Sequence, residues 1–137
     1  MRLFTLEEAN ALIPKLELIM GRLQQCGAEL RLGVEAVARE CGRSIDALTM
    51  DDIVKLRPEL TGVAEEIKGL IAQIEAQEVQ FKGLDLGLVD FLAEIDGDIA
   101  LLCWQYGEKE ITHWHTLDGG FAGRRPLRDA ATRSYLQ

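Results

Sequence analysis

The stretch of sequence that decides the fold runs from residue 13 to residue 41 and reads IPKLELIMGRLQQCGAELRLGVEAVAREC. Apolar or small residues recur along it at alternating spacings of three and four, which places them on one face of an α-helix. The pattern predicts one long amphipathic helix, and Gly42 directly after it is a residue type that commonly ends helices. This seam consists of Ile13, Leu16, Met20, Leu23, Gly27, Leu30, Val34, Val37 and Cys41.

The start of this helical region is indicated by Thr5, which stands three residues before Glu8 in the spacing of a capping box. Pro14 lies a few residues further on, lacks a backbone N–H donor and clashes with the preceding helical turn. We therefore expect either a short first helix that ends near Leu12 and a restart with Pro14 in the first turn, or a kink at this point.

A second seam with the same alternating spacing lies between residues 53 and 81. Thr49, with two aspartates behind it, is suited to cap the start of this helix, and Pro58 indicates an early kink or a delayed helix start. Two helices of about 28 residues joined by a short loop most simply form an antiparallel hairpin. The second seam consists of Ile53, Leu56, Leu60, Val63, Ile67, Leu70, Ile74, Gln77 and Phe81.

A helical hairpin on its own leaves apolar surface exposed to water. Either the C-terminal third of the chain or a second copy of the chain must cover this surface, and two hairpins side by side would make a four-helix bundle. Of these two alternatives, we prefer a homodimer that forms through its helices.

The composition changes after residue 82, where seven glycines separate short apolar runs and favour turns and strands over long helices. Residues 99–106 and 110–117 are rich in aliphatic and aromatic side chains and predict a small β-hairpin cap. Its register stays open: a two-residue turn places Cys103 opposite Thr112, and a three-residue turn places it opposite His113. The predicted fold is mainly α within the α+β class, a long antiparallel helical hairpin with a C-terminal β-hairpin cap.

The chain of 137 residues has the length of one domain, which we divide into the helical hairpin (1–82), the cap (83–123) and a basic tail (124–137). Its formal net charge of -8 repels nucleic acids and anionic membrane surfaces, which argues against both as partners. Residues 84–118 carry eight acids and one base, so the acidic excess is concentrated in the cap.

The sequence predicts a cytoplasmic protein. No uncharged stretch is long enough to cross a bilayer, and the first residues lack the apolar core of a signal peptide. The three cysteines, Cys26, Cys41 and Cys103, include no Cys-x-x-Cys pair, and reduced thiols are expected.

The candidate metal site centres on His113 and His115, the two histidines of the chain. At positions i and i+2 of a strand both imidazoles point to one face, where they could share a Zn²⁺, Ni²⁺ or Fe²⁺ ion. The alternative is that both imidazoles make hydrogen bonds that hold the cap together, and without a strong third partner this alternative is favoured. The candidates for a third ligand are Cys103, Glu108, Asp90, Asp96 and Asp98.

Other chemistry has weaker support in the sequence. Neither serine of the chain stands in a Gly-x-Ser-x-Gly turn, and Cys103 lies inside an apolar run, so no nucleophile is apparent. Asp90, Glu108 and the histidines could form an acid–base cluster if the cap closes a cleft. The glycine-rich segment before Arg124 and Arg125 could bind an anion, although a turn whose arginines pair with acidic residues is the simpler interpretation.

Six short motifs are distributed along the chain: RLFTLEEAN at residues 2–10, GLVDF at 87–91, LCW at 102–104, GE at 107–108, WH at 114–115 and GFAGR at 120–124. With these motifs the sequence resembles a bacterial family catalogued as a domain of unknown function, family 2203. The resemblance spans nearly the whole chain. It implies a small helical bacterial protein, and it brings no activity, substrate or cofactor with it.

The preferred interpretation is a non-catalytic binding or interaction protein that dimerises through its helices and presents the cap as a recognition surface. The alternative is a metal-dependent small-molecule binder or enzyme that uses His113, His115 and a carboxylate or thiolate of the cap. The two interpretations differ in whether the purified protein contains a metal ion.

Overall fold

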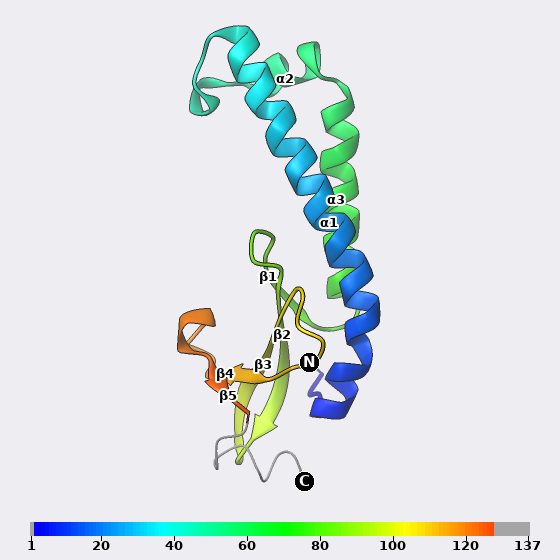
Figure 1. The fold of residues 1–137 in the computed structure, drawn as a ribbon, viewed down its shortest axis with the longest axis vertical. Helices are drawn as coiled ribbons and strands as arrows, with labels where there is room; N and C mark the ends of the chain where they lie inside the picture. The colour runs from blue at the N-terminus through cyan, green and yellow to red at the C-terminus, as the bar shows by residue number, and fades with distance from the viewer. Residues whose placement is uncertain (1, 128–137) are drawn as a thin grey trace.

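The computed structural model describes residues 2–127, which form a mixed α+β fold with a long N-terminal helix and an antiparallel sheet (Figure 1). The part of the predicted basic tail from residue 128 onward lies outside the described residues. The helices are α1 (Leu6–Cys41), α2 (Met50–Leu56) and α3 (Glu59–Glu75), with 3₁₀ turns η1 (Ile45–Ala47) and η2 (Phe121–Gly123). The strands are β1 (Gln80–Gly83), β2 (Leu88–Ile95), β3 (Asp98–Gln105), β4 (His113–His115) and β5 (Arg125–Pro126).

Helix α1 begins and ends where the sequence predicts. At its start the Glu8 amide donates to Thr5 Oγ1 at 3.1 Å, and the Thr5 amide donates to Glu8 Oε1 at 2.8 Å, which completes the capping box. At its end Gly42 takes the left-handed conformation, with a φ of 62°, and its amide bonds back to the last turn.

The helix boundary expected near Leu12 is wrong, because α1 continues through Pro14 as one helix. The proline removes one backbone hydrogen bond from the helix. Ile13 and Leu16 on either side of it are buried in the core, and the burial of such side chains outweighs the loss of a single hydrogen bond.

The second predicted helix, of about 28 residues, is wrong in its extent, since the chain forms the short α2 and the longer α3 instead. Arg57 leaves the helical conformation, with φ −144° and ψ 69°, and Pro58 is the N-cap of α3. This is the delayed start that Pro58 indicated in the sequence. Helix α3 then ends at Glu75, and Phe81, the last residue of the predicted seam, lies in β1, where sheet pairing replaces helical hydrogen bonds.

Helices α1 and α3 lie side by side (Figure 1). Gly33 permits their close approach, because a Cβ atom at this position would lie 2.6 Å from Leu60 Cδ2. Across the same interface the Arg22 guanidinium donates to both carboxylate oxygens of Glu66, at 2.6 and 2.8 Å. Neither these helices nor any other within residues 2–127 combine the length and the apolar character that a membrane-spanning segment needs.

The strands form a single antiparallel sheet in the order β1-β2-β3-β4-β5. The pairing of β3 with β4 follows the register of the three-residue turn, with Cys103 opposite His113. The predicted hairpin is therefore part of a larger sheet. The sequence analysis did not define β2, which pairs with β3 along its whole length, from Leu88 to Ile95.

One face of this sheet packs against α1 and forms the hydrophobic core. The rings of Phe4 and Phe91 meet edge to face, with centroids 5.2 Å apart, and join the segment before α1 to β2. The core side chains of the sheet include Val89, Phe91, Ala93, Ala100, Leu102, Trp104 and Trp114, and those of α1 include Ala9, Ile13, Leu16, Met20 and Leu23.

The core predicts a large effect of truncating Phe91. Phe91→Ala removes a fully buried ring that contacts Phe4 and should lower the free energy of unfolding by about 3–5 kcal/mol. Truncation of Leu18, which is 79% exposed on α1, should change it by less than about 0.5 kcal/mol. Urea unfolding measures both variants, and equal costs at the two positions would contradict this description of the core.

Candidate functional site

Three titratable side chains lie on the face of the sheet opposite the hydrophobic core. Side chains alternate between the two faces along each strand, and this alternation places Asp90 of β2, Cys103 of β3 and His115 of β4 on the outer face. Their exposed fractions are 3%, 1% and 3%. The segment after β4 contributes to this burial, because Leu117 and Phe121 line the same cavity as the three side chains.

The tautomer of His115 follows from its neighbours. Its Nδ1 lies 2.8 Å from the backbone oxygen of Thr116, and its Nε2 lies 3.0 Å from Asp90 Oδ2. A carbonyl oxygen can only accept a hydrogen bond, so Nδ1 carries a proton and donates a hydrogen bond to the Thr116 carbonyl. The contact between Nε2 and the carboxyl oxygen then requires one proton, held either by the imidazole or by the carboxyl group. A cation in place of this proton would meet a nitrogen and an oxygen donor at once.

Burial raises the proton affinity of the two other groups. Removal from water raises the pKa of Asp90, while His115 and the hydrogen bond from the Cys103 thiol act in the opposite direction. Burial, together with the neighbouring Asp90 carboxylate, raises the pKa of the Cys103 thiol to about 12. Without a bound cation Cys103 is a neutral thiol near pH 7 and lacks the thiolate character of a nucleophile.

Asp90, Cys103 and His115 line one cavity of about 250 Å³. Each offers one donor atom, and these atoms all lie within 4.8 Å of one another. A tetrahedral Zn²⁺ ion with bonds of about 2.0–2.3 Å holds its ligand atoms about 3.5 Å apart. Side-chain movements of about 1 Å would therefore bring the three donors into contact with one ion.

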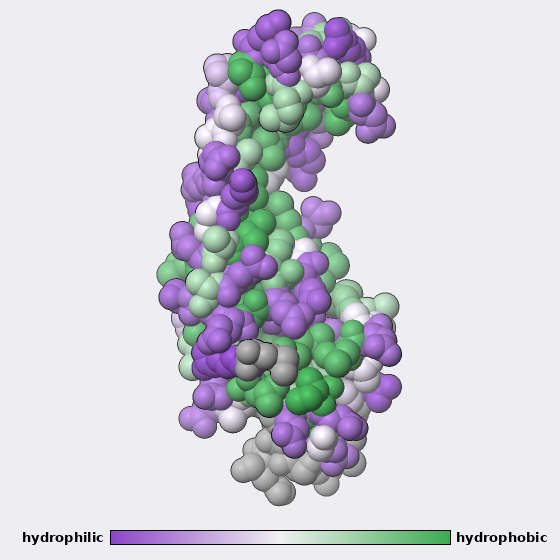
Figure 2. Space-filling view, turned by 180° about the vertical axis from the view of Figure 1, so that it is seen from behind, coloured by the Kyte–Doolittle hydropathy of each residue, from purple (hydrophilic) through white to green (hydrophobic). Residues whose placement is uncertain are grey.

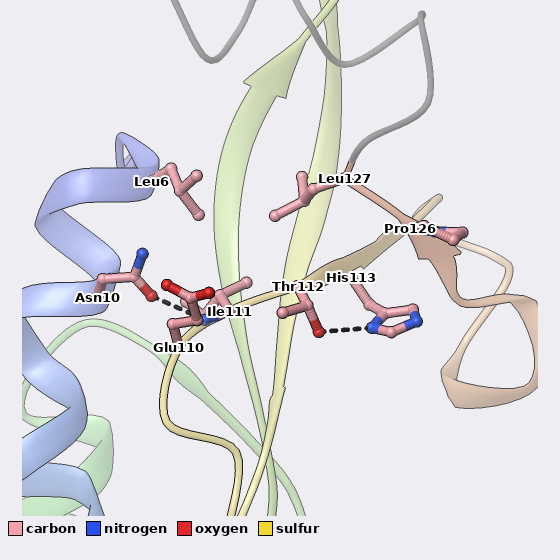
Figure 3. Close-up of a pocket in the computed structure, with 8 residues that line it drawn as sticks. All are labelled: Leu6, Asn10, Glu110, Ile111, Thr112, His113, Pro126 and Leu127. Carbon is pink, nitrogen blue, oxygen red and sulfur yellow. Dashed lines mark hydrogen bonds between the residues drawn. The ribbon is translucent and has the colours of Figure 1, made fainter.

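His113 lies apart from this cluster, although only one residue separates it from His115. Its Nδ1 is 2.8 Å from Thr112 Oγ1, and its ring lines a different cavity, between the start of α1 and the last strand (Figure 3). At this cavity the Ile111 amide donates to Asn10 Oδ1 at 2.8 Å, which links the segment before β4 to α1. The two imidazoles thus line separate cavities.

Glu108 is also outside the cluster and stabilises the connection between β3 and β4. Its carboxylate accepts from the Gln105 amide at 2.7 Å and from Arg124 Nη2 at 2.9 and 3.1 Å. Its backbone oxygen accepts from Trp104 Nε1 at 2.8 Å. Arg124 also approaches the backbone oxygen of Cys103, at 3.4 Å, so this guanidinium holds a loop in place and is paired with an acid.

The remaining candidates from the sequence lie elsewhere. Asp98 begins β3, five residues and about 17 Å from Cys103, and Asp96 lies in the turn just before it. The Arg125 guanidinium lies over the Trp114 ring, 5.3 Å from its centroid. The structure thus brings together three of the predicted metal ligands, and it places the other acids and the two arginines outside the cluster.

The cavity also contains a residue that the sequence analysis did not single out, Lys82 of β1. The sequence pattern gave no indication of it, because Lys82 falls at the end of the predicted helical hairpin, just after the last seam residue, Phe81. Its place beside Asp90 arises only when β1 pairs with β2.

Fold and site together define a class: mixed α+β proteins in which a long helix covers one face of an antiparallel sheet and a buried Asp–Cys–His cluster lies on the other. The chain belongs to the family described as uncharacterized conserved protein (DUF2203), whose family model matches residues 2–127. The resemblance of the short motifs is thereby confirmed. Comparison with curated proteins and with solved structures finds no significant match.

The hydrogen bond between Asp90 and His115 leads us to expect that two substitutions of Asp90 lower the free energy of unfolding of the metal-free protein by different amounts. Asp90→Asn keeps a donor for Nε2 of a neutral imidazole, so the contact survives. Asp90→Ala leaves the buried Nε2 without a partner and should cost about 1–3 kcal/mol more free energy of unfolding than Asp90→Asn. Urea unfolding of chelator-treated variants measures the difference, and equal costs would show that the contact does not stabilise the fold.

Proposed function

We propose that the protein binds one divalent transition-metal ion of the Zn²⁺ type through Asp90, Cys103 and His115. The observation that supports this proposal is the convergence of an oxygen, a sulfur and a nitrogen donor on one buried cavity. Ca²⁺ and Mg²⁺ prefer oxygen ligands alone, whereas thiolate and imidazole favour Zn²⁺ and neighbouring transition metals.

The balance of charge in the buried site supports the same proposal. A carboxylate, a thiolate and a neutral imidazole carry two negative charges, which one divalent cation neutralises. In the absence of a cation, burial disfavours the thiolate of Cys103. Metal binding would therefore release the thiol proton and the proton shared by Asp90 and His115.

The hydrogen bond from His115 to Thr116 is of the kind that accompanies metal ligands. Because Nδ1 donates to the Thr116 carbonyl, Nε2 is the nitrogen that faces Asp90 and the cavity. A second hydrogen bond at the other ring nitrogen orients a ligating imidazole and raises its basicity.

Metal content after reconstitution tests the proposal. Untagged protein is stripped with a chelator and titrated with Zn²⁺ or Co²⁺, and we expect one bound ion per chain and a higher melting temperature. Co²⁺ should also produce the charge-transfer absorption of a cobalt–thiolate bond, which reports on the cysteine directly. Asp90→Asn, Cys103→Ser and His115→Gln should each weaken binding, because each removes one donor from the ion.

The chain provides matched controls for this experiment. His113→Gln changes the other histidine of β4, and Cys41→Ser changes a free cysteine of α1. Both variants should bind the ion like the wild type. Absence of binding in the wild type, or full binding by Cys103→Ser and His115→Gln, would refute the proposed site.

A second candidate function, interaction through a homodimer, is favoured by a different part of the molecule. The helices extend well beyond the sheet (Figure 1), and hydrophobic side chains are exposed at their far end (Figure 2). Charge does not oppose association there, since residues 31–57 carry five bases and five acids while the whole chain carries -8. We propose that α1 and α3 act as a helical hairpin whose far end is covered by a second copy. The exposed residues are Leu32, Ile45, Met50, Val54 and Leu56.

If the far end of the helices forms a dimer, charged substitutions at this end should convert the dimer to a monomer. Sedimentation velocity over a range of concentrations should show a dimer for the wild type and a monomer for the Met50→Asp, Val54→Asp double variant. These positions are 68% and 45% exposed, so the variant should remain folded. Leu18→Asp, on the half of α1 beside the sheet, should still dimerise, and a wild-type monomer at every concentration would exclude this candidate function.

A further inference from the structure

We infer that the metal ion at Asp90, Cys103 and His115 keeps one coordination position open to the cavity, and that this position takes a short-chain monocarboxylate whose charge Lys82 also binds. The inference rests on the proposed function and extends it to a class of ligand. Four observations lead to it: the number of protein donors, the lining of the cavity, the backbone at Lys82 and the charge of the site.

The number of donors leaves the proposed ion incompletely coordinated. Within residues 2–127 the cluster contains three ligand groups. Structural Zn²⁺ sites use four protein ligands, whereas sites that act on a small molecule use three and leave the fourth position to water or to the ligand. Glu108, another ligand that the sequence suggested, is held by Arg124 and the Gln105 amide.

The open position borders a small cavity with mainly apolar walls. All three ligand residues line the cavity, so an ion held between them has the cavity on one side. Its volume of about 250 Å³ is below the range of about 300–1,000 Å³ that is typical for drug-sized ligands, which limits the ligand to a few heavy atoms. The apolar lining residues are Leu88, Leu101, Leu117 and Phe121.

Lys82 provides a positive charge at the same cavity. The pairing of β1 with β2 skips this residue, because Phe81 and Gly83 pair with consecutive residues of β2. Such a bulge redirects the side chain of the extra residue. Lys82 lines this cavity together with Asp90, so it brings a positive charge to the site of the proposed ion. Lys82 is itself exposed, so the cavity reaches solvent on the side where an anion would enter.

Charge and polarity together select a monocarboxylate. With Asp90 and Cys103 ionised, a divalent metal site is neutral, and Lys82 can balance one further negative charge. A dianion such as phosphate would leave one charge without a partner, since the Arg124 guanidinium is already paired with Glu108. The apolar walls favour an alkyl group behind the carboxylate.

Carboxylate titrations of the Co²⁺-loaded protein test the inference. Formate, acetate and propionate should each cause a saturable change in the visible absorption bands of the cobalt ion, which report its coordination number. Each added methylene that enters the cavity should tighten binding about fourfold. If chloride or phosphate binds as tightly as propionate, or if chain length has no effect, the assigned ligand class is wrong.

Substitution of the exposed Lys82 distinguishes binding of the carboxylate from binding of the metal ion. Lys82→Met should weaken propionate binding about tenfold, while the variant should still bind one equivalent of Co²⁺, because the substitution removes a charged hydrogen-bond donor but no metal ligand. Lys82→Arg should restore part of the affinity, and Lys68→Met on α3 should have no effect. One equivalent of Co²⁺ whose spectrum does not respond to any carboxylate would overturn this inference alone. Failure to bind Co²⁺ would remove the proposed function and this inference with it.

Discussion

The pairing of β2 with β3 is the interaction on which the rest of the structure depends. One register places Phe91 opposite Leu102 on the core face and Asp90 opposite Cys103 on the outer face, because side chains alternate with a period of two. If β2 slipped by one residue along β3, the Asp90 carboxyl group would turn toward α1 and away from Cys103, and the Phe91 ring would turn toward the outer face. The same ladder of hydrogen bonds therefore determines both the hydrophobic core and the candidate site.

Both faces of the central strands are buried, so the polar side chains on the outer face are removed from water. An antiparallel sheet commonly has one face in water, but here α1 covers one face and the segment after β4 contributes to the cover of the other. Polar groups in such a place require partners. The chain of contacts from Asp90 through His115 to the Thr116 carbonyl meets this requirement in the metal-free protein. A divalent cation would meet it as well, since it balances the charges that burial otherwise disfavours.

The helical part of the molecule has two regions with different surroundings. The first half of α1 packs on the sheet, whereas its last turns pack mainly on the shorter helices, with Leu60 against Gly33 (Figure 1). The far end of the helices buries few large side chains and exposes several apolar ones. The candidate metal site and the candidate interaction surface therefore lie in separate parts of the molecule, and changes in one need not disturb the other.

The sequence by itself determined the features that depend on near neighbours. These are the start of α1 at the Thr5 capping box, its end at Gly42, and the presence of strands around Cys103, because caps, seams and alternation act within a few residues. The sequence also included all three residues of the cluster among its candidate metal ligands, but it did not distinguish them from the other candidates. Only the tertiary structure decided that His115 and not His113 joins Asp90, which lies 25 residues away in the chain. The physical reason is that spacing places a side chain on one face of its own strand, while the neighbouring strand and the segment that covers it depend on contacts between distant parts of the chain.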